Sequence, residues 1–129
     1  MSIYPPTSAI VLAGGISRRL GQDKRHLRLW GAAEPTLLEY VVGIVARLCV
    51  DVVVVLNDPD AWADLPARLV PDVYPDGGSL GGIYSGLHAA KHDYALAVAC
   101  DMPFLEAALL DAMLARPRDY DVLVPRSLA

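Results

Sequence analysis

The sequence predicts a single three-layer α/β domain over residues 1–129, in which a mostly parallel β-sheet carries helices on both faces. Three observations predict this fold. Short apolar, β-branched runs alternate with helix-length amphipathic segments, which is typical of parallel strands joined by helices. The run at 51–56 is almost continuously apolar, as expected for a strand covered on both faces. A length of 129 residues with 54% hydrophobic residues suits one domain with a sizeable core.

The first half of the chain predicts a strand, a loop, a helix and a second strand. Residues 9–12 are predicted to form a short buried strand that leads into a glycine-rich loop. Residues 36–49 carry apolar side chains at three- and four-residue spacing, which predicts an amphipathic helix. Thr36 is its expected N-cap, and Gly43 weakens the helix. The second strand is expected at 51–56.

The second half continues the alternation. Residues 68–71 predict a third, short strand, and residues 82–91 predict a helix after a glycine-rich loop. The apolar run 94–100 is expected to be the most deeply buried strand. A helix at 105–114 and a last strand at 121–125 complete the predicted order.

The loop after the first strand has the composition of an anion-binding site. From residue 12 it reads Leu-Ala-Gly-Gly-Ile-Ser-Arg-Arg-Leu-Gly-Gln-Asp-Lys. Glycines let the backbone approach a ligand closely, and successive exposed N–H groups form a concavity for anions. The spacing fits neither a Walker A loop nor the dinucleotide fingerprint G-x-G-x-x-G. We predict a polyphosphate-binding loop, with an ordinary glycine-rich turn bearing solvated charges as the alternative.

The charge distribution favours a small anionic ligand. The net charge is −4 and the pI is about 5.2, so neither a nucleic acid nor a membrane is an expected partner. Positive charge is concentrated in one short segment. It contains Arg18, Arg19, Lys24, Arg25 and Arg28.

The cysteine content and the hydropathy pattern indicate a soluble, cytoplasmic protein. Cys49 and Cys100 are the only cysteines, and both lie in apolar segments, which predicts buried, reduced thiols. No signal-peptide pattern is present at the N-terminus. The most apolar region, 41–56, is interrupted by charges and is not expected to span a bilayer.

Polar residues follow the other predicted strands as well. Asp101 ends the strand 94–100, where its carboxylate would either bind Mg²⁺ beside a polyphosphate or cap the following helix. Asp72 precedes a glycine-rich segment whose N–H groups are exposed at a helix start. Asn57 follows the second strand and is either a turn former or a nucleotide ligand. Because ligands bind beyond the carboxyl ends of parallel strands, we expect these loops to form one site.

Three segments resemble those of one family. Residues 12–24 match L-A-G-G-x-S-x-R-x-G-x-D-K, which resembles the nucleotide loop of the molybdenum cofactor guanylyltransferases of the MobA type. The sequence Cys-Asp-Met-Pro-Phe at 100–104 is similar to the family's metal-binding segment, and 72–83 looks like its D…G-P-L-x-G-[IM] loop. The resemblance covers nearly the whole chain. It implies the Rossmann-like fold of the nucleotide-diphospho-sugar transferase type.

The resemblance also implies a reaction and its residues. GMP would pass from GTP to the phosphate of molybdenum–molybdopterin, with release of pyrophosphate. Lys24 and Arg19 would meet the phosphates, with Arg19 favoured over Arg18, and Asp101 would bind Mg²⁺ as the third catalytic residue. Asp72 would accept hydrogen bonds from N1–H and the exocyclic amine of guanine. The implied nucleotide-binding residues are Leu12, Ala13, Gly14, Gly15, Lys24, Asn57, Asp72, Gly78, Gly82 and Asp101.

The chain departs from the family pattern in two respects. Ser79 replaces the usual proline of the third segment, and the family's C-terminal region, with its Asn-x-Asn-Thr-Pro-type segment, has no counterpart here. We therefore expect a C-terminally truncated nucleotide-binding domain, whose partners include acceptor molybdoenzymes or a complementing subunit. Two alternatives stay open. One is a related nucleotidyltransferase acting with CMP or on a sugar phosphate, and the other is a nucleotide-binding fragment without catalysis.

Overall fold

The computed structural model describes residues 4–14 and 23–126, and within them strands and helices alternate as the sequence predicts. The elements are β1 (Ser8–Leu12), α1 (Leu37–Leu48), β2 (Asp51–Val55), β3 (Arg68–Val70), α2 (Gly78–Ala89), β4 (Ala95–Ala99) and α3 (Ala107–Leu114). The strands form one sheet in the order β3-β2-β1-β4, and every pair is parallel. All carboxyl ends therefore lie at the same edge of the sheet.

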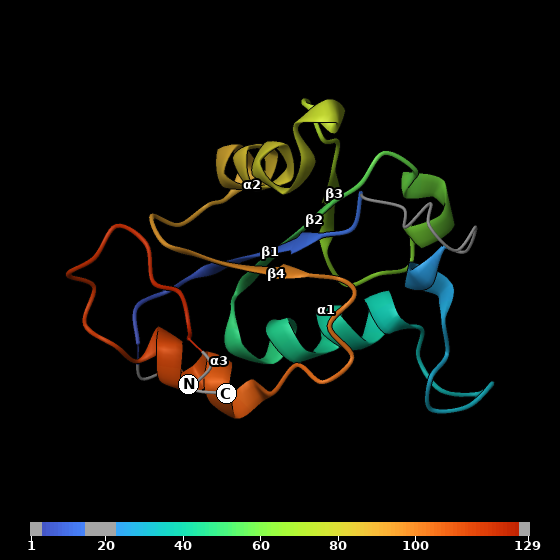
Figure 1. Ribbon diagram of the computed structural model, residues 1–129, viewed down its shortest axis with the longest axis horizontal. Helices are drawn as coiled ribbons and strands as arrows, with labels where there is room; N and C mark the ends of the chain where they lie inside the picture. Colours follow the sequence, from blue (N-terminus) through green and yellow to red (C-terminus); the bar gives the residue numbers. More distant parts are fainter. Residues whose placement is uncertain (1–3, 15–22, 127–129) are drawn as a thin grey trace.

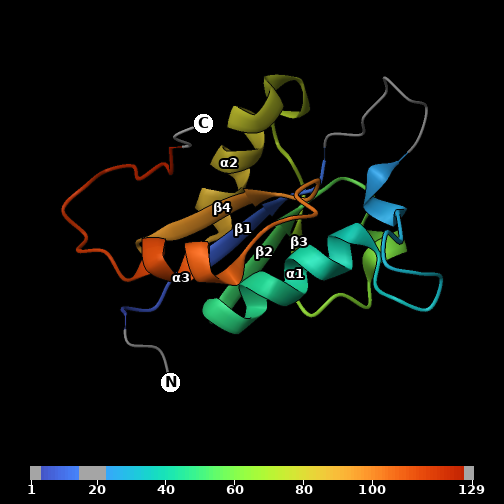
Figure 2. The same ribbon diagram turned by 60° about the horizontal axis from the view of Figure 1, so that its bottom comes forward.

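The two faces of the sheet carry different helices, which confirms the three-layer fold. Figures 1 and 2 show α2 on one face and α1 with α3 on the other. Side chains alternate accordingly along β1: Ala9 and Val11 join the core under α1 and α3, whereas Ile10 packs with Val53 and Val55 on the α2 side. The strands β1 and β2 are almost fully buried because helices cover them on both faces.

Helix α1 begins at the predicted cap. The Thr36 hydroxyl accepts a hydrogen bond from the Glu39 backbone N–H (3.2 Å), and the Glu39 carboxylate accepts one from the Thr36 N–H (2.8 Å). This reciprocal arrangement is a capping box, which satisfies N–H groups left free in the first turn. Gly43 lies on the exposed side of the helix, where no other group approaches within 4 Å of the position a Cβ would take.

Helix α2 begins at Gly78, four residues before the predicted start at residue 82. The glycines at 78, 81 and 82 are helical, although glycine is a poor helix former, so the sequence had indicated a loop there. Tertiary contact explains the difference. A Cβ at Gly86 would overlap Ile10 of β1, and a Cβ at Gly81 would overlap the Tyr74 carbonyl. Gly86 thus lets α2 lie close to β1, and Gly81 lets it lie close to the segment that precedes the helix.

Two predictions about the last third of the chain are wrong. Strand β4 is an edge strand in the described sheet, with Ala97 exposed, and the buried centre is β1 and β2. Residues 121–125 do not form a strand, and Val122 and Val124 are exposed. A β-branched run becomes a strand only where a partner strand pairs with it. In the part of the chain that the structure covers, no helix is long and apolar enough to cross a membrane.

Candidate functional site

A cavity of about 300 Å³ lies where the carboxyl ends of the four strands meet the N-terminus of α2. Seven residues that the sequence assigned to nucleotide binding line it: Leu12, Gly14, Asn57, Asp72, Gly78, Gly82 and Asp101. They come from the loops after β1, β2, β3 and β4 and from α2, so residues far apart in the sequence converge on one site. The other described residues that line the cavity are Val55, Pro75, Ser79, Ala99 and Cys100.

Asp72 and Asn57 are linked by hydrogen bonds across the ends of β2 and β3. The Asn57 side-chain oxygen accepts a hydrogen bond from the Asp72 backbone N–H (2.9 Å). The Asp72 Oδ1 in turn accepts from the Tyr74 N–H (2.9 Å) and, more weakly, from the Ser85 hydroxyl (3.4 Å). Asn57 therefore both shapes the turn and lines the cavity. These contacts fix the Asp72 carboxylate, and each carboxylate oxygen retains capacity to accept a further donor.

Glycines keep space open beside that carboxylate. The position of a Cβ on either Gly14 or Gly82 would lie 4.0 Å from the Asp72 Oδ2, so this oxygen lies near both glycines. A Cβ on Gly82 would also come within 2.9 Å of Leu12 Cδ2. Side chains at these positions would reduce the volume of the cavity, whereas glycines let a ligand approach the backbone.

The N-terminus of α2 gives the cavity a favourable potential for anions. The helix has 12 residues, and Gly78 and Ser79 in its first turn line the cavity. The N–H groups of a first turn lack partners within the helix, and the helix dipole places partial positive charge there. The arrangement is suited to binding phosphate or carboxylate groups.

Asp101 lies two residues after the end of β4 and lines the cavity with an exposed side chain. The alternative that Asp101 caps the next helix is wrong, because α3 begins at Ala107 with Glu106 as its N-cap residue. Burial, reinforced by the negative charge of Asp101, raises the pKa of the Cys100 thiol to about 11.

The carboxylates of the cavity fit one mode of Mg²⁺ binding. Residues 4–14 and 23–126 contain no group of three or more acidic, histidine or cysteine side chains that could hold a metal by themselves. Mg²⁺ is commonly bound by one or two carboxylates together with substrate phosphates and water. Asp101, which lines the cavity, could supply a carboxylate of that donor set.

The basic residues divide into three groups. Lys24 lies in the 3₁₀ turn Lys24–His26 and is not among the described residues that line the cavity. Two further arginines, Arg18 and Arg19, lie outside the described residues, as do the loop residues Gly15 and Ser17. The sequence placed Arg25 in the basic segment expected to favour an anionic ligand. In the structure Arg25 is instead buried and paired with Asp23 and Asp58. The hydrogen bonds that Arg25 donates to the Asp23 carboxylate raise the pKa of Arg25 above its ordinary value, so Arg25 is a fixed cation of the scaffold.

Ala13 is also a scaffold residue. It is fully buried, and its N–H donates to the Val55 carbonyl (3.0 Å), which extends the pairing of β1 with β2 beyond the strand end. Its own carbonyl accepts a hydrogen bond from Arg25 (3.1 Å). Ala13 therefore holds the start of the glycine loop in place behind the cavity.

A second ionic network, which sequence reasoning missed, lies at the opposite end of the sheet. The buried Asp51 accepts hydrogen bonds from the Ser8 hydroxyl (2.7 Å), the Lys91 backbone N–H (3.0 Å) and the Arg68 guanidinium (2.9 Å). Burial alone would raise the pKa of Asp51, but these hydrogen bonds outweigh it and lower the pKa. The sequence signal for this network was a pair of opposite charges, Asp51 and Arg68, at the starts of two neighbouring strands.

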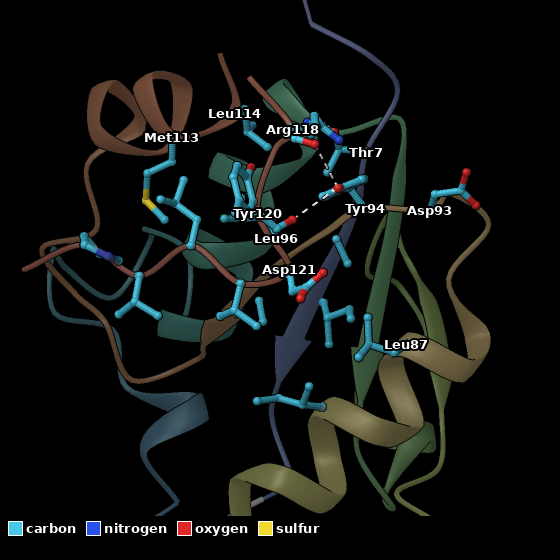
Figure 3. Close-up of a pocket in the computed structure, with 18 residues that line it drawn as sticks. Thr7, Leu87, Asp93, Tyr94, Leu96, Met113, Leu114, Arg118, Tyr120 and Asp121 are labelled. Atoms are coloured by element: carbon cyan, nitrogen blue, oxygen red, sulfur yellow. Dashed lines mark hydrogen bonds between the residues drawn. The ribbon is translucent and has the colours of Figure 1, made fainter. Parts of the chain in front are cut away.

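A larger cavity of about 610 Å³ lies beside β4 and contains none of the predicted site residues. Figure 3 shows it between β4, α2 and the segment at 118–125, with the Tyr94 hydroxyl linked to two backbone carbonyls. Those carbonyls belong to Arg118 and Tyr120, each 3.2 Å away. We assign the site to the smaller cavity, because among the described residues it combines the carboxyl ends of the strands, a helix N-terminus and the predicted site residues.

Comparisons with known proteins find relatives that match nearly the whole chain. A family profile described as a MobA-like NTP transferase domain matches residues 9–129. A protein named "Probable molybdenum cofactor guanylyltransferase" from Chloroflexus aggregans is 51% identical over 127 residues, covering 98% of this chain and 61% of that protein. The molybdenum cofactor guanylyltransferase of Desulfosudis oleivorans is 38% identical over 119 residues, covering 92% of this chain and 58% of that protein.

Solved structures share the fold. The molybdopterin-guanine dinucleotide biosynthesis protein A of Archaeoglobus fulgidus superposes with a TM-score of 0.60 at 26% identity, covering 82% of this chain and 53% of that one. A CMP:2-keto-3-deoxy-manno-octonic acid synthetase complexed with CTP has a TM-score of 0.69 at 15% identity, covering 85% of this chain and 46% of that one. This chain spans about 60% of the length of the two curated relatives.

Proposed function

Because this chain belongs to the MobA-like NTP transferase family, we propose that its cavity binds GTP as part of a molybdenum cofactor guanylyltransferase. The observation that carries the proposal is the convergence of seven predicted nucleotide-binding residues on one cavity. Its volume of about 300 Å³ is at the lower end of the range for small-molecule sites, roughly 300–1,000 Å³. The relatives' names supply the nucleotide and the acceptor, a molybdopterin-type cofactor.

The proposed reaction is transfer of GMP. A phosphate oxygen of molybdopterin attacks the α-phosphorus of GTP, a new P–O bond forms, and the bond to the bridging oxygen of pyrophosphate breaks. The protein positions two polyanions and neutralises charge, so no covalent enzyme intermediate is required. The N–H groups at the start of α2 would bind phosphate oxygens, and Lys24 and Arg19 would stabilise the leaving pyrophosphate. Mg²⁺ held by Asp101 would supply further positive charge to the phosphates.

Guanine selectivity is proposed to rest on Asp72. Guanine presents two adjacent donors, N1–H and the exocyclic amine, which match the two oxygens of a carboxylate, whereas cytosine lacks this pair. The Asp72 carboxylate is held by Tyr74 and faces Gly14 and Gly82, which supports this assignment. An acceptor that a bound ligand buries without a donor costs about 1–3 kcal/mol, which sets the expected preference for GTP over CTP at roughly 5-fold to 150-fold.

Calorimetric titration with GTP and with CTP, each with Mg²⁺, tests the proposal. We expect GTP to bind more tightly than CTP, Asp72→Asn to remove most of that preference, and Asp101→Asn to remove the enhancement by Mg²⁺. Equal affinities for GTP and CTP in the unmodified protein would contradict guanine selectivity. Retention of the Mg²⁺ enhancement in Asp101→Asn would contradict the metal site.

A turnover assay with GTP, Mg²⁺ and molybdopterin then separates catalysis from binding alone. Formation of pyrophosphate and the dinucleotide product supports the transferase. Tight binding of GTP without product supports a nucleotide-binding part that acts with a complementing subunit.

The two buried cysteines, which suit a reducing compartment, support a cytoplasmic location.

A further inference from the structure

Arg25 is the buried centre of a hydrogen-bond cluster beside the cavity. Its side chain is only 3% exposed. Nε and Nη2 donate to the two oxygens of Asp23 (2.8 and 2.6 Å), and Nη1 and Nη2 donate to the two oxygens of Asp58 (2.6 and 2.7 Å). The remaining donor of Nη1 reaches the Ala13 carbonyl (3.1 Å). All five N–H groups of the guanidinium therefore have an acceptor.

These acceptors come from three segments, two of which contribute residues to the cavity wall. Ala13 directly precedes Gly14, at the point where the chain leaves β1. Asp58 directly follows Asn57, which lines the cavity and accepts the Asp72 N–H. Asp23 is the N-cap of the turn that carries Lys24, where the chain returns from the glycine loop. One side chain thus joins both ends of the loop to the end of β2.

The charge of Arg25 is already neutralised within this cluster. Two carboxylates surround one guanidinium, so the ionised cluster has a net charge of −1, and it offers no free cation to a phosphate. The Trp62 ring, 5.7 Å from the guanidinium carbon, packs on one side of it. The arrangement argues against direct contact of Arg25 with a nucleotide and in favour of a role through its neighbours.

We propose that Arg25 is a positioning residue, which holds Gly14, Asn57 and Lys24 in the geometry that binds the nucleotide. This inference rests on the proposed function for the identity of the ligand. The guanidinium is a rigid, planar fork that can satisfy two carboxylates and a carbonyl at once, whereas a lysine ammonium has three donors on a flexible stem. A lysine at position 25 would keep the charge and lose the geometry. Misplacement of binding groups by about 1 Å can reduce the efficiency of a site by roughly 100-fold.

The first test compares Arg25→Lys with Arg68→Lys. Arg68 also pairs with a buried carboxylate, that of Asp51, but at the opposite end of the sheet. With both variants shown to be folded by circular dichroism, titration with GTP and Mg²⁺ measures affinity. We expect Arg25→Lys to weaken binding at least tenfold and Arg68→Lys to change it less than twofold. Wild-type affinity in Arg25→Lys, or an equal loss in both variants, would overturn the positioning role.

A second measurement does not need a ligand, so it separates failure of this inference from failure of the proposed function. Amide hydrogen exchange reports the hydrogen bonds that Ala13 donates to Val55 and that Asp72 donates to Asn57. We expect both amides to exchange faster in Arg25→Lys than in Arg68→Lys. Unchanged exchange at both would refute the inference even if GTP binds. If no GTP binds to the wild type, the proposed function fails, and the exchange rates alone then decide whether Arg25 holds these segments in place.

Asp58 offers a milder variant should Arg25→Lys not fold, because its side chain is about half exposed (48%). Asp58→Asn removes one charged acceptor of Arg25, whereas Asp58→Glu keeps both carboxylate oxygens. We expect weaker GTP binding and faster exchange at Ala13 in Asp58→Asn, with substantial rescue in Asp58→Glu. Equal behaviour of the two variants, both at wild-type levels, would count against the proposal.

Discussion

Gly86 lies where α2 packs against Ile10 of β1, and its replacement by alanine measures how much the short distance between helix and sheet matters. The added Cβ would overlap Ile10 Cγ2 and lie 3.0 Å from Cγ1 and 3.1 Å from Cδ1. Ile10 is fully buried and β-branched, so its side chain has few alternative rotamers. Carbon atoms pack best at about 3.5–4.0 Å, so α2 would have to move outward by roughly 1 Å.

Two opposing contributions set the expected change in stability. Alanine in place of glycine favours a helix by about 1 kcal/mol. Overpacking of a rigid core position costs about 1–3 kcal/mol, and contact with three atoms of one buried side chain places Gly86→Ala in the upper part of that range. We expect a net destabilisation of about 1–2 kcal/mol. For a domain of this size, this lowers Tm by roughly 3–8 °C.

Gly43→Ala is the matched control. Gly43 is helical and exposed, and nothing lies within 4 Å of the position of its Cβ, so only the propensity contribution remains. We expect this variant to be more stable than the wild type by about 0.5–1 kcal/mol. Urea unfolding, followed by circular dichroism and Trp fluorescence, measures both changes.

A compensating substitution makes the test sharper. Ile10→Leu removes Cγ2 while keeping the side-chain volume, so it should recover part of the stability that Gly86→Ala loses. The reasoning is refuted if Gly86→Ala is as stable as Gly43→Ala, or if Ile10→Leu adds its cost to that of Gly86→Ala without any coupling. Either result would mean that close approach does not fix the position of α2.

Four further predictions follow from other contacts. Thr36→Ala removes the cap of α1 and should cost about 1 kcal/mol in urea unfolding, and an unchanged midpoint would contradict the capping box. Asp51 has a lowered pKa, so its pairing stabilises the fold above its ordinary pKa and this contribution is lost as the pH falls through the lowered value. Asp51→Asn should therefore cost about 1–3 kcal/mol at neutral pH and progressively less below about pH 4, and a pH-independent difference would contradict this. Burial raises the pKa of Cys49 and of Cys100 to about 11, so a thiol reagent at pH 8 should modify them far more slowly than in urea, and equal rates would be inconsistent with burial. The Cβ added in Gly82→Ala would press on the end of the Leu12 side chain, and this cost should offset the helix propensity gained from alanine, so we expect a nearly unchanged unfolding midpoint with weaker GTP binding; wild-type affinity would contradict the position of the site.

Much of this fold was predictable because its signals are local. The strands at 9–12, 51–56 and 68–71 and the helix at 36–49 lie within one or two residues of their predicted positions. Apolar runs and three- to four-residue spacing depend on neighbouring residues alone. The convergence of Asp72, Asn57 and Asp101 was also predictable, because the carboxyl ends of parallel strands share one edge.

The sequence alone thus determined the layers, the cap of α1 and the edge of the sheet that carries the site. Only the tertiary structure decided the features that depend on distant partners. Helix α2 starts at Gly78, although the intrinsic propensity of glycine opposes a helix, and its Gly82 and Gly86 lie against Leu12 and Ile10 of β1. Residues 121–125 have the composition of a strand, but none of the described strands pairs with them. Arg25 is a scaffold cation because Asp58, 33 residues away in sequence, lies beside it in space.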